Sequence, residues 1–387
     1  MELLVVLLKR SRIVHLMFAI TFFTSGLIIN FFQCILYFGL RPFSKYLYRK
    51  INYYLCYSFY SQLVFVAEWW AAADVILYID KDDFEKYYGR EHGYLLMNHS
   101  YEIDWLVGWV FCDRVQLLGN CKAYAKKSIQ YIPTLGWAWK FAESIFLERR
   151  WDKDRETIGA QIRELADYPD FMWLLLYAEG TRYTPEKAEA SQKFAQEKGL
   201  PVLKHHLTPR TRGFTASIPH MKGKVSGIYD IQLAFKSTDI KPTITNLLLG
   251  KAATAHMYMN RIPLESVPEG DEAAAQWLQN IYQVKDKMAD SFAKTGDFFA
   301  TSGVPRVEPF RLKRRYWSLI NSLAWAVIVL VPMLYYLIRL LLSGSTMYFS
   351  IGAGIIILFF ILMNKTIEMS EISKSSSYGA AETKKAK

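Results

Sequence analysis

The chain has 387 residues and a formal net charge of +11; 52% of its residues are hydrophobic and 16% are aromatic. Long uncharged runs within this composition argue against a freely soluble protein. The positive charge would suit nucleic acid, an anionic membrane surface or phosphorylated substrates, and the apolar runs favour the last two, so we expect no nucleic-acid partner. Cysteines at positions 34, 56, 112 and 121 have neither CxxC pairing nor zinc-site spacing, so we expect reduced thiols and no metal.

The first long apolar run extends from Ile13 to Leu40 without a charged residue, between Arg12 and Arg41. One membrane span needs about 20 apolar residues. The run therefore either crosses the bilayer with a tilt or dips in and returns as two short helices that break near Gly26. A cleaved signal peptide is disfavoured, because its apolar region would be only about 7–15 residues long. We predict a retained membrane anchor over residues 1–44.

Residues 45–79 are rich in aromatic side chains but carry Glu68 and Asp74 within their most apolar part. Charges are costly at bilayer depth, and the pair Trp69-Trp70 fits the headgroup zone. We predict an interfacial helix that leads into a strand over Asp74–Ile79. The alternative is an ordinary buried helix that packs on the following domain.

A histidine and an aspartate five positions apart follow the next buried strand, predicted over Gly93–Met97. Helical spacing of apolar residues then begins near Glu102, and we expect Ser100 to cap that helix, with Asp104 about one turn inside it. His99 would lie on the loop between strand and helix. Because the chain can fold back at this loop, we expect the Asp104 carboxylate to reach the imidazole. Such a pair suits general-base catalysis, in which the carboxylate orients the imidazole that takes a proton from an alcohol.

From residue 93 to about residue 259, short apolar runs alternate with helical patterns, which predicts an α/β domain with a mostly parallel sheet. The amphipathic stretch Trp151–Tyr168 has Ile158, Ile162 and Leu165 on one face and is predicted to be a helix. Sites in such sheets form at the carboxyl ends of strands, where the loop of His99 and a second loop at residues 179–182 are expected. The further strand-like segments are Cys121–Ala125, Ser144–Leu147, Phe171–Tyr177, Pro201–His205, Ile228–Phe235 and Thr254–Met259.

The C-terminal third predicts a turn-rich connector, a helix over Asp271–Lys294 and then two apolar runs, Tyr316–Ile338 and Leu340–Met363. We interpret the two runs as a transmembrane hairpin over residues 311–364 that follows a catalytic domain over residues 80–310. Basic residues at 311–315 favour the cytosol at the start of the hairpin, so the domain and the polar tail at 365–387 are expected there too. The tail ends in Lys384-Lys385-Ala386-Lys387, which matches the dilysine signal for retrieval to the endoplasmic reticulum.

In the order of its motifs the sequence resembles the 1-acylglycerol-3-phosphate O-acyltransferase family. The residues within the motifs are most similar to those of the animal gamma and delta forms. Thr208-Pro209-Arg210-Thr211-Arg212-Gly213-Phe214 and Ser375-Ser376-Ser377-Tyr378-Gly379 add to that likeness. The resemblance implies the same α/β fold. The motifs, in chain order, are Asn98-His99 with Asp104, Lys126 with Pro133 and Gly136, Phe146 with Arg149, Glu179-Gly180-Thr181-Arg182, and an apolar block around Pro201.

The resemblance implies transfer of an acyl group from acyl-CoA to the sn-2 hydroxyl of lysophosphatidic acid in a membrane, with His99 as general base and Asp104 as its orienting group. Acyl-CoA is then a co-substrate, and no cofactor is expected. Two alternatives remain: another acceptor, such as lysophosphatidylinositol in phospholipid remodelling, or a non-catalytic lipid-binding protein with the same fold. The residues implied to bind substrate, mainly the acceptor phosphate, are Lys126, Arg149, Glu179, Gly180, Thr181 and Arg182; Glu179 is expected to orient Arg182 or its loop.

Overall fold

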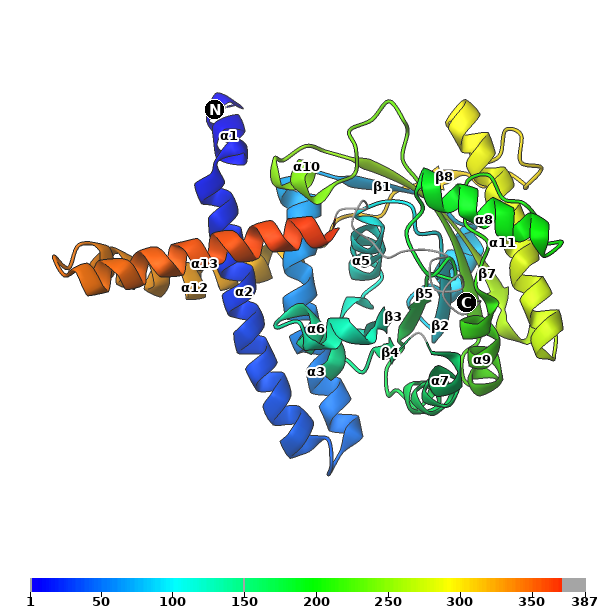
Figure 1. Ribbon diagram of the computed structural model, residues 1–387, viewed down its shortest axis with the longest axis horizontal. Helices are drawn as coiled ribbons and strands as arrows, with labels where there is room; N and C mark the ends of the chain where they lie inside the picture. Colours follow the sequence, from blue (N-terminus) through cyan, green and yellow to red (C-terminus); the bar gives the residue numbers. More distant parts are fainter. Residues whose placement is uncertain (1, 149, 371–387) are drawn as a thin grey trace, which may run out of the picture.

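The computed structural model describes residues 2–148 and 150–370 (Figure 1). Its centre is one eight-stranded sheet with the strand order β4-β3-β5-β2-β6-β7-β1-β8. All neighbouring strands are parallel except the pairs β6–β7 and β1–β8, which confirms the predicted mostly parallel α/β fold. The strands are β1 (Asp74–Tyr78), β2 (Gly93–Met97), β3 (Cys121–Lys126), β4 (Ile145–Leu147), β5 (Trp173–Leu176), β6 (Gly227–Ala234), β7 (Thr254–Pro263) and β8 (Pro309–Phe310).

Helices cover both faces of the sheet. Alternate residues of β2 point to opposite faces: Leu95 and Met97 join the core formed with α3 and α5, and Tyr94 and Leu96 join the core formed with α7, α9 and α11. The helices are α1 (Glu2–Arg10), α2 (Arg12–Ile35), α3 (Lys45–Phe65), α4 (Lys81–Tyr87), α5 (Asp104–Arg114), α6 (Leu135–Phe141), α7 (Trp151–Ala166), α8 (Pro185–Glu197), α9 (Thr211–Met221), α10 (Ile244–Leu248), α11 (Asp271–Thr295), α12 (Trp317–Leu341) and α13 (Thr346–Ser370).

The N-terminal apolar run is one continuous helix, because α2 continues through a π-helical turn at Leu36–Leu40. The alternative of two short helices that break at Gly26 is therefore wrong. Gly26 serves close packing instead: a Cβ added there would lie 2.7 Å from the ring of Phe59 and 3.1 Å from Cβ of Thr134. Helix α3 lies beside α2 and ends in a second π-helical turn, Val66–Trp70.

Helix α3 packs on the sheet domain. This is the buried helix that we gave as the alternative to an interfacial helix. Tyr48, Cys56 and Phe59 are fully buried. Glu68, in the turn that ends α3, is also buried and lies 2.7 Å from the Arg114 guanidinium. The charge of Glu68 is thus balanced by an arginine of α5 inside the protein.

Two local expectations are wrong. Pro201–His205 is an irregular segment and not a strand, because the backbone N–H groups of Lys204 and His205 donate to the Asp286 carboxylate of α11. The turn of the hairpin does not lie at Arg339, which stays helical and donates to the Tyr335 hydroxyl at 3.2 Å. The chain turns between Leu341 and Thr346, where Gly344 has a φ of 71°.

The hairpin of α12 and α13 projects away from the sheet domain (Figure 1). Polar side chains fasten its root to α3: Asn321 donates to the Ser58 carbonyl and to the Ser61 hydroxyl, and the Trp325 indole donates to the Ser58 hydroxyl. Three helical stretches, Arg12–Leu40, Trp317–Leu341 and Thr346–Glu368, are long and apolar enough to cross a membrane. These segments fit a membrane-associated protein.

A buried carboxylate ties the N-terminal helices to the domain. Glu143 accepts hydrogen bonds from Arg49 at 2.8 Å and from Arg41 at 3.0 Å. Burial alone would raise the pKa of Glu143, but the hydrogen bond and charge of Arg49, together with the charges of Lys122 and Arg41, hold it below its ordinary value. Glu143 therefore stays charged at neutral pH and balances both guanidinium groups.

We expect Glu143→Gln to lower the free energy of unfolding by about 3 kcal/mol, because the nearly buried Arg49 guanidinium would lose its counter-charge. Thermal unfolding in detergent micelles measures the change. Glu164→Gln is the matched control: its carboxylate, which pairs with Lys45 and Arg41, is about half exposed, so a loss below about 1 kcal/mol is expected. Equal losses in the two variants would contradict the assigned role of Glu143.

Candidate active site

The side chains of His99 and Asp104 are in contact, as we expected from a loop that folds back between the strand and the helix. The side-chain Nδ1 of His99 lies 2.7 Å from the Asp104 Oδ2. His99 follows β2 directly and its side chain is 16% exposed, whereas the Asp104 side chain is completely buried. Because Nδ1 contacts the carboxylate, Nε2 is the nitrogen left to act on another molecule, and the described part of the chain offers no hydrogen bond to it.

The expected start of the helix is wrong. Helix α5 begins at Asp104 itself, with Ile103 as its N-cap residue, and Ser100 makes no cap. Instead, Asp104 turns its own carboxylate back to accept from the backbone N–H of Trp105 at 2.7 Å and from that of Tyr101 at 3.4 Å. The same carboxylate thus begins the helix and holds the imidazole, which fixes the distance between them.

Tyr177 completes the surroundings of this pair, and the sequence analysis missed its role. Its ring stacks on the imidazole of His99 with the ring centroids 3.9 Å apart. Its hydroxyl donates to the Asp104 Oδ1 at 3.3 Å. Burial, together with the Asp104 charge, raises the pKa of Tyr177 well above its ordinary value, so the hydroxyl keeps its proton. The available signal was a tyrosine at the carboxyl end of the predicted strand Phe171–Tyr177, directly before the 179–182 loop.

Glu179 holds the loop that follows β2. Its buried carboxylate accepts from the backbone N–H of His99 at 2.9 Å and from that of Leu207 at 3.1 Å. The backbone N–H of Tyr183 donates to the His99 carbonyl at 2.7 Å. Both backbone polar groups of His99 are therefore bound by the 179–183 loop, which follows β5, the strand beside β2.

The rest of the 179–182 loop is shaped by neighbouring cations. Gly180 has a φ of 71°, and a Cβ added there would lie 2.9 Å from the Cδ of Arg210, so a glycine is required. The buried Lys187 ammonium donates to the Thr181 hydroxyl at 3.0 Å and to the Arg182 carbonyl at 3.2 Å. The Arg182 guanidinium donates to the Glu102 carbonyl at 3.5 Å, which places it beside the loop of His99.

The two remaining site candidates are not brought into this group of contacts. Lys126 ends β3, two strands from β2, and its side chain is exposed. Arg149 lies outside the described residues. Residue 210, noted in the sequence only as part of the family likeness, lies against Gly180 and so belongs to the site. Among the residues that the structure describes, no cluster of His, Cys, Asp or Glu could hold a metal ion.

The arrangement can supply an oriented imidazole beside a basic loop. His99 is fixed at its backbone, its ring face and one ring nitrogen, and Asp104 would stabilise the imidazolium formed when Nε2 takes a proton. Arg182 and Arg210 bring positive charge to the adjoining loop. The roles of these side chains in catalysis and binding stay predictions.

Comparison with known proteins gives two family matches and several full-length relatives. The family model for the acyltransferases matches residues 79–226, and the model for the acyltransferase C-terminus matches residues 246–325. The 1-acyl-sn-glycerol-3-phosphate acyltransferase gamma of Homo sapiens is 41% identical over 383 residues, which cover 99% of each chain. The delta protein of Bos taurus is 40% identical over 385 residues, 98% of each chain, and that of Rattus norvegicus 39% over 387 residues, 99% of this chain and 98% of its own.

No solved structure matches this chain significantly. The family likeness therefore rests on the sequence relatives and on the two domain matches, and it agrees with the resemblance drawn from the ordered motifs. The relatives are aligned over almost their whole length, so the likeness includes the membrane-type helices as well as the sheet domain. The chain belongs to the acyltransferase family that includes the 1-acyl-sn-glycerol-3-phosphate acyltransferases gamma and delta.

Proposed function

We propose that this protein transfers an acyl group from acyl-CoA to the sn-2 hydroxyl of lysophosphatidic acid and releases phosphatidic acid and CoA. The names of relatives that are about 40% identical support the acceptor. The observation that carries the mechanism is the 2.7 Å contact between the His99 Nδ1 and the Asp104 Oδ2, next to the basic 179–182 loop. Acyl-CoA serves as a co-substrate, and the mechanism needs no cofactor.

In the proposed reaction the acceptor hydroxyl is the nucleophile. Nε2 of His99 takes the hydroxyl proton as the oxygen attacks the thioester carbonyl carbon, and Asp104 stabilises the imidazolium. When the tetrahedral intermediate collapses, the carbon–sulfur bond breaks and the imidazolium returns its proton to the CoA sulfur. No side chain of the protein is acylated at any stage.

The acceptor phosphate is assigned to the basic loop. Arg182 provides a planar guanidinium that suits two phosphate oxygens at once, and Gly180 leaves room for close approach of the backbone. Lys126 and Arg149 are proposed to complete the phosphate site when substrate is bound. Thr181, whose hydroxyl accepts from Lys187, keeps the loop in shape, and Glu179 positions it through the backbone of His99.

The membrane segments suit substrates with long acyl chains, since each CH₂ group gains roughly 0.8 kcal/mol when it is buried away from water. We propose that the hairpin over residues 311–364 crosses the membrane of the endoplasmic reticulum twice. By the positive-inside rule, its basic start would hold the domain over residues 80–310 on the cytosolic side. The dilysine sequence at the end of the tail supports a location in the endoplasmic reticulum. It lies outside the residues that the structure describes.

We expect His99→Ala to lower the rate of acyl transfer at least 100-fold, because a general base contributes about that much or more. Asp104→Asn should also cause a large loss, since the amide cannot stabilise an imidazolium. Rates with saturating acyl-CoA and lysophosphatidic acid measure both changes. His220→Ala, which removes a half-buried histidine of α9 that contacts Arg163 of α7, is the control and should keep full activity. A His99→Ala protein as active as this control would refute the assignment of the base.

Arg182→Ala should act on the acceptor and not on the donor. Loss of a charge-assisted hydrogen bond of about 1.5–3 kcal/mol corresponds to a rise of about 10- to 100-fold in the KM for lysophosphatidic acid. The KM for acyl-CoA should stay unchanged. Initial rates over a matrix of both substrates separate the two effects, with Lys198→Ala, an exposed position just after α8, as the control. An unchanged KM for lysophosphatidic acid would show that Arg182 does not bind the acceptor phosphate.

The reaction itself is tested with labelled acyl-CoA in microsomes that contain the protein or its His99→Ala variant. Lysophosphatidic acid is offered beside lysophosphatidylinositol and other lysophospholipids. We expect phosphatidic acid to form fastest, with no product above background in the variant. Faster transfer to another acceptor would leave the proposed mechanism intact but show that lysophosphatidic acid is not the preferred substrate. Product at background level with both proteins would favour the non-catalytic lipid-binding alternative.

A further inference from the structure

Tyr177, the residue that faces the His99 imidazole, is placed by the alternation of side chains along β5. Leu176 points into the core formed with α7, α9 and α11, whereas Tyr177 packs on the core formed with α3 and α5. Helix α5 begins with Asp104, and Leu176 lies opposite Leu96 of β2, three residues before His99. The first side chain beyond β5 on this face therefore reaches both members of the His99–Asp104 pair.

A tight turn at residues 177–180 binds His99 at a second point. The backbone N–H of Gly180 donates to the Tyr177 carbonyl at 2.9 Å, and the φ of 71° at Gly180 closes the turn. The turn presents the Tyr177 ring to the imidazole and the Glu179 carboxylate to the His99 backbone N–H. One turn thus holds both the ring and the backbone of His99.

The ring of Tyr177 covers one face of the imidazole. The two ring centroids are 3.9 Å apart, and the ring planes are 18° from parallel. An imidazole that rotated about its bond to Cβ would collide with this ring, so Nδ1 stays on the Asp104 Oδ2 and Nε2 points away from the carboxylate. The stacked ring therefore keeps the imidazole in one orientation.

The hydroxyl of Tyr177 acts on the other oxygen of Asp104. Oδ1 accepts from this hydroxyl at 3.3 Å and from the backbone N–H of Trp105 at 2.7 Å. A buried carboxylate so close to an imidazole favours the protonated imidazolium, and a histidine that is already protonated cannot serve as a base. Each donor to Oδ1 takes up part of the negative charge and so weakens this effect.

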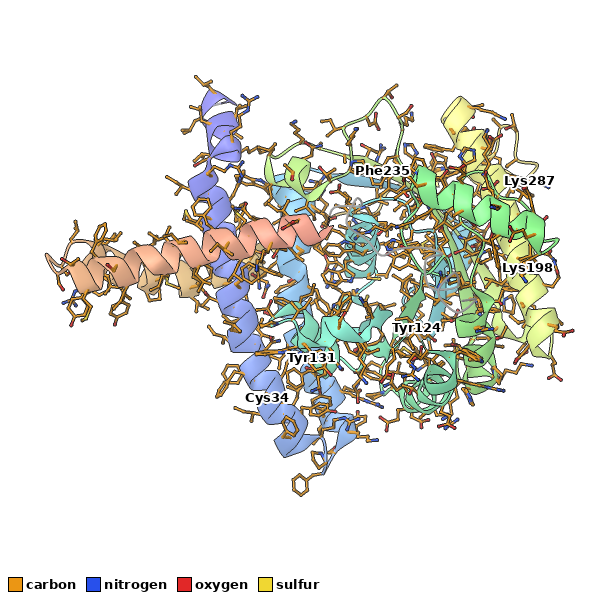
Figure 2. The ribbon with its side chains drawn as sticks, in the orientation of Figure 1. Cys34, Tyr124, Tyr131, Lys198, Phe235 and Lys287 are labelled. Atoms are coloured by element: carbon orange, nitrogen blue, oxygen red, sulfur yellow. The ribbon has the colours of Figure 1, made fainter. Side chains whose placement is uncertain are left out.

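The other titratable or charged side chains around the pair are Tyr101, Glu179, Arg182 and Tyr183. Tyr101 packs on Phe235, which Figure 2 labels, and its hydroxyl accepts from the Phe235 backbone N–H at 3.4 Å. The side chains at positions 179 and 182 bind backbone groups, and the Tyr183 hydroxyl donates to a backbone carbonyl at 3.2 Å. In the described part of the chain, Tyr177 is the hydroxyl that donates to Asp104.

We propose that Tyr177 is a positioning residue for the general base. Its ring fixes the plane of the imidazole, and its hydroxyl draws charge from Asp104, so that the carboxylate orients the imidazole without holding it in the protonated form. The inference rests on the proposed acyl transfer, in which Nε2 of His99 takes the proton of the acceptor hydroxyl. Tyr177 acts through the His99–Asp104 pair and not on either substrate.

Tyr177→Phe keeps the ring and removes the hydroxyl. Because Asp104 would then act on the imidazolium with more of its charge, we expect the acidic limb of the pH profile of kcat/KM to move upward by about 0.5 pH unit. On that limb the variant would be roughly threefold slower than the unmodified chain at the same pH, and above it the two rates would be close. Initial rates of acyl transfer between pH 5 and pH 9 measure the shift.

Tyr229→Phe is the matched control. The hydroxyl of this buried tyrosine of β6 also donates to a carboxylate, that of Glu91 at 2.7 Å, near the opposite end of β2. Loss of that bond lowers stability in the same way, but the acidic limb should not move. An unmoved limb in Tyr177→Phe, or the same shift in Tyr229→Phe, would overturn the proposal.

The protonation of His99 is also measured without turnover. Diethyl pyrocarbonate modifies the neutral imidazole, and digestion with mass spectrometry separates the His99 peptide from those of the other histidines. We expect the midpoint of modification to rise by about 0.5 pH unit in Tyr177→Phe, and this shift to vanish when both chains carry Asp104→Asn. A shift that persists with Asp104→Asn would contradict action through the carboxylate. Acyl transfer without the modification shift would overturn this inference alone, whereas the shift without acyl transfer would support it and refute the proposed function.

Tyr177→Leu tests the ring. Without the stacked ring the imidazole is less well oriented, so we expect kcat to fall about tenfold while the KM values for both substrates stay within about twofold. The two-substrate rate matrix separates these constants. A raised KM for lysophosphatidic acid at unchanged kcat would show that Tyr177 binds the acceptor, and it would overturn the positioning role.

Discussion

The buried carboxylate of Glu179 is the interaction on which the candidate site depends. Each of its oxygens accepts a backbone N–H, one from His99 after β2 and one from Leu207 in the irregular segment before α9. Three segments that come from different parts of the chain are thereby joined at one point beside β5. This structural role explains an acidic residue at position 179 without any part in catalysis. If the carboxylate were absent, the two N–H groups would lose their acceptor.

The same loop makes His99 rigid before any substrate is present. Its N–H and C=O are bound to the 179–183 loop, its ring lies on Tyr177, and its Nδ1 contacts Asp104. Asp104, fully buried, in turn needs several donors, and it obtains them from the start of α5 and from the Tyr177 hydroxyl. Only Nε2 is left for a reactant, so the tautomer and direction of the imidazole are set by the fold, as efficient proton transfer requires.

The membrane-type helices are part of the folded unit and are not attached to it through a flexible linker. Helix α3 packs under the sheet, α2 packs on α3, and the hairpin is fastened to α3 by Asn321 and Trp325. The contact of Gly26 with Thr134 brings α2 to the Lys126–Gly136 motif itself.

Much of the fold followed from local patterns. The strand before His99, the amphipathic helix α7 with Ile158, Ile162 and Leu165 buried, and the two apolar helices of the hairpin were all predicted, because hydrophobic periodicity reflects burial directly. The contact of His99 with Asp104 was predicted because the two are close in sequence. The predicted start of α5 was wrong because the Asp104 carboxylate itself accepts from the nearby backbone N–H groups of Tyr101 and Trp105. The predicted strand at Pro201–His205 was wrong because the distant Asp286 carboxylate binds its backbone.

The sequence by itself determined the order of the motifs, the family and the positions of the apolar segments, since each of these is written in short stretches of neighbouring residues. Only the tertiary structure decided that Glu179 binds His99, 80 positions away, that Tyr177 supports the imidazole, and that Gly26 of α2 packs against Thr134. These are contacts between buried polar or closely packed groups from separate elements. Which of them meet is set by the strand order of the sheet and by the packing of helices upon it, and no local pattern contains that information.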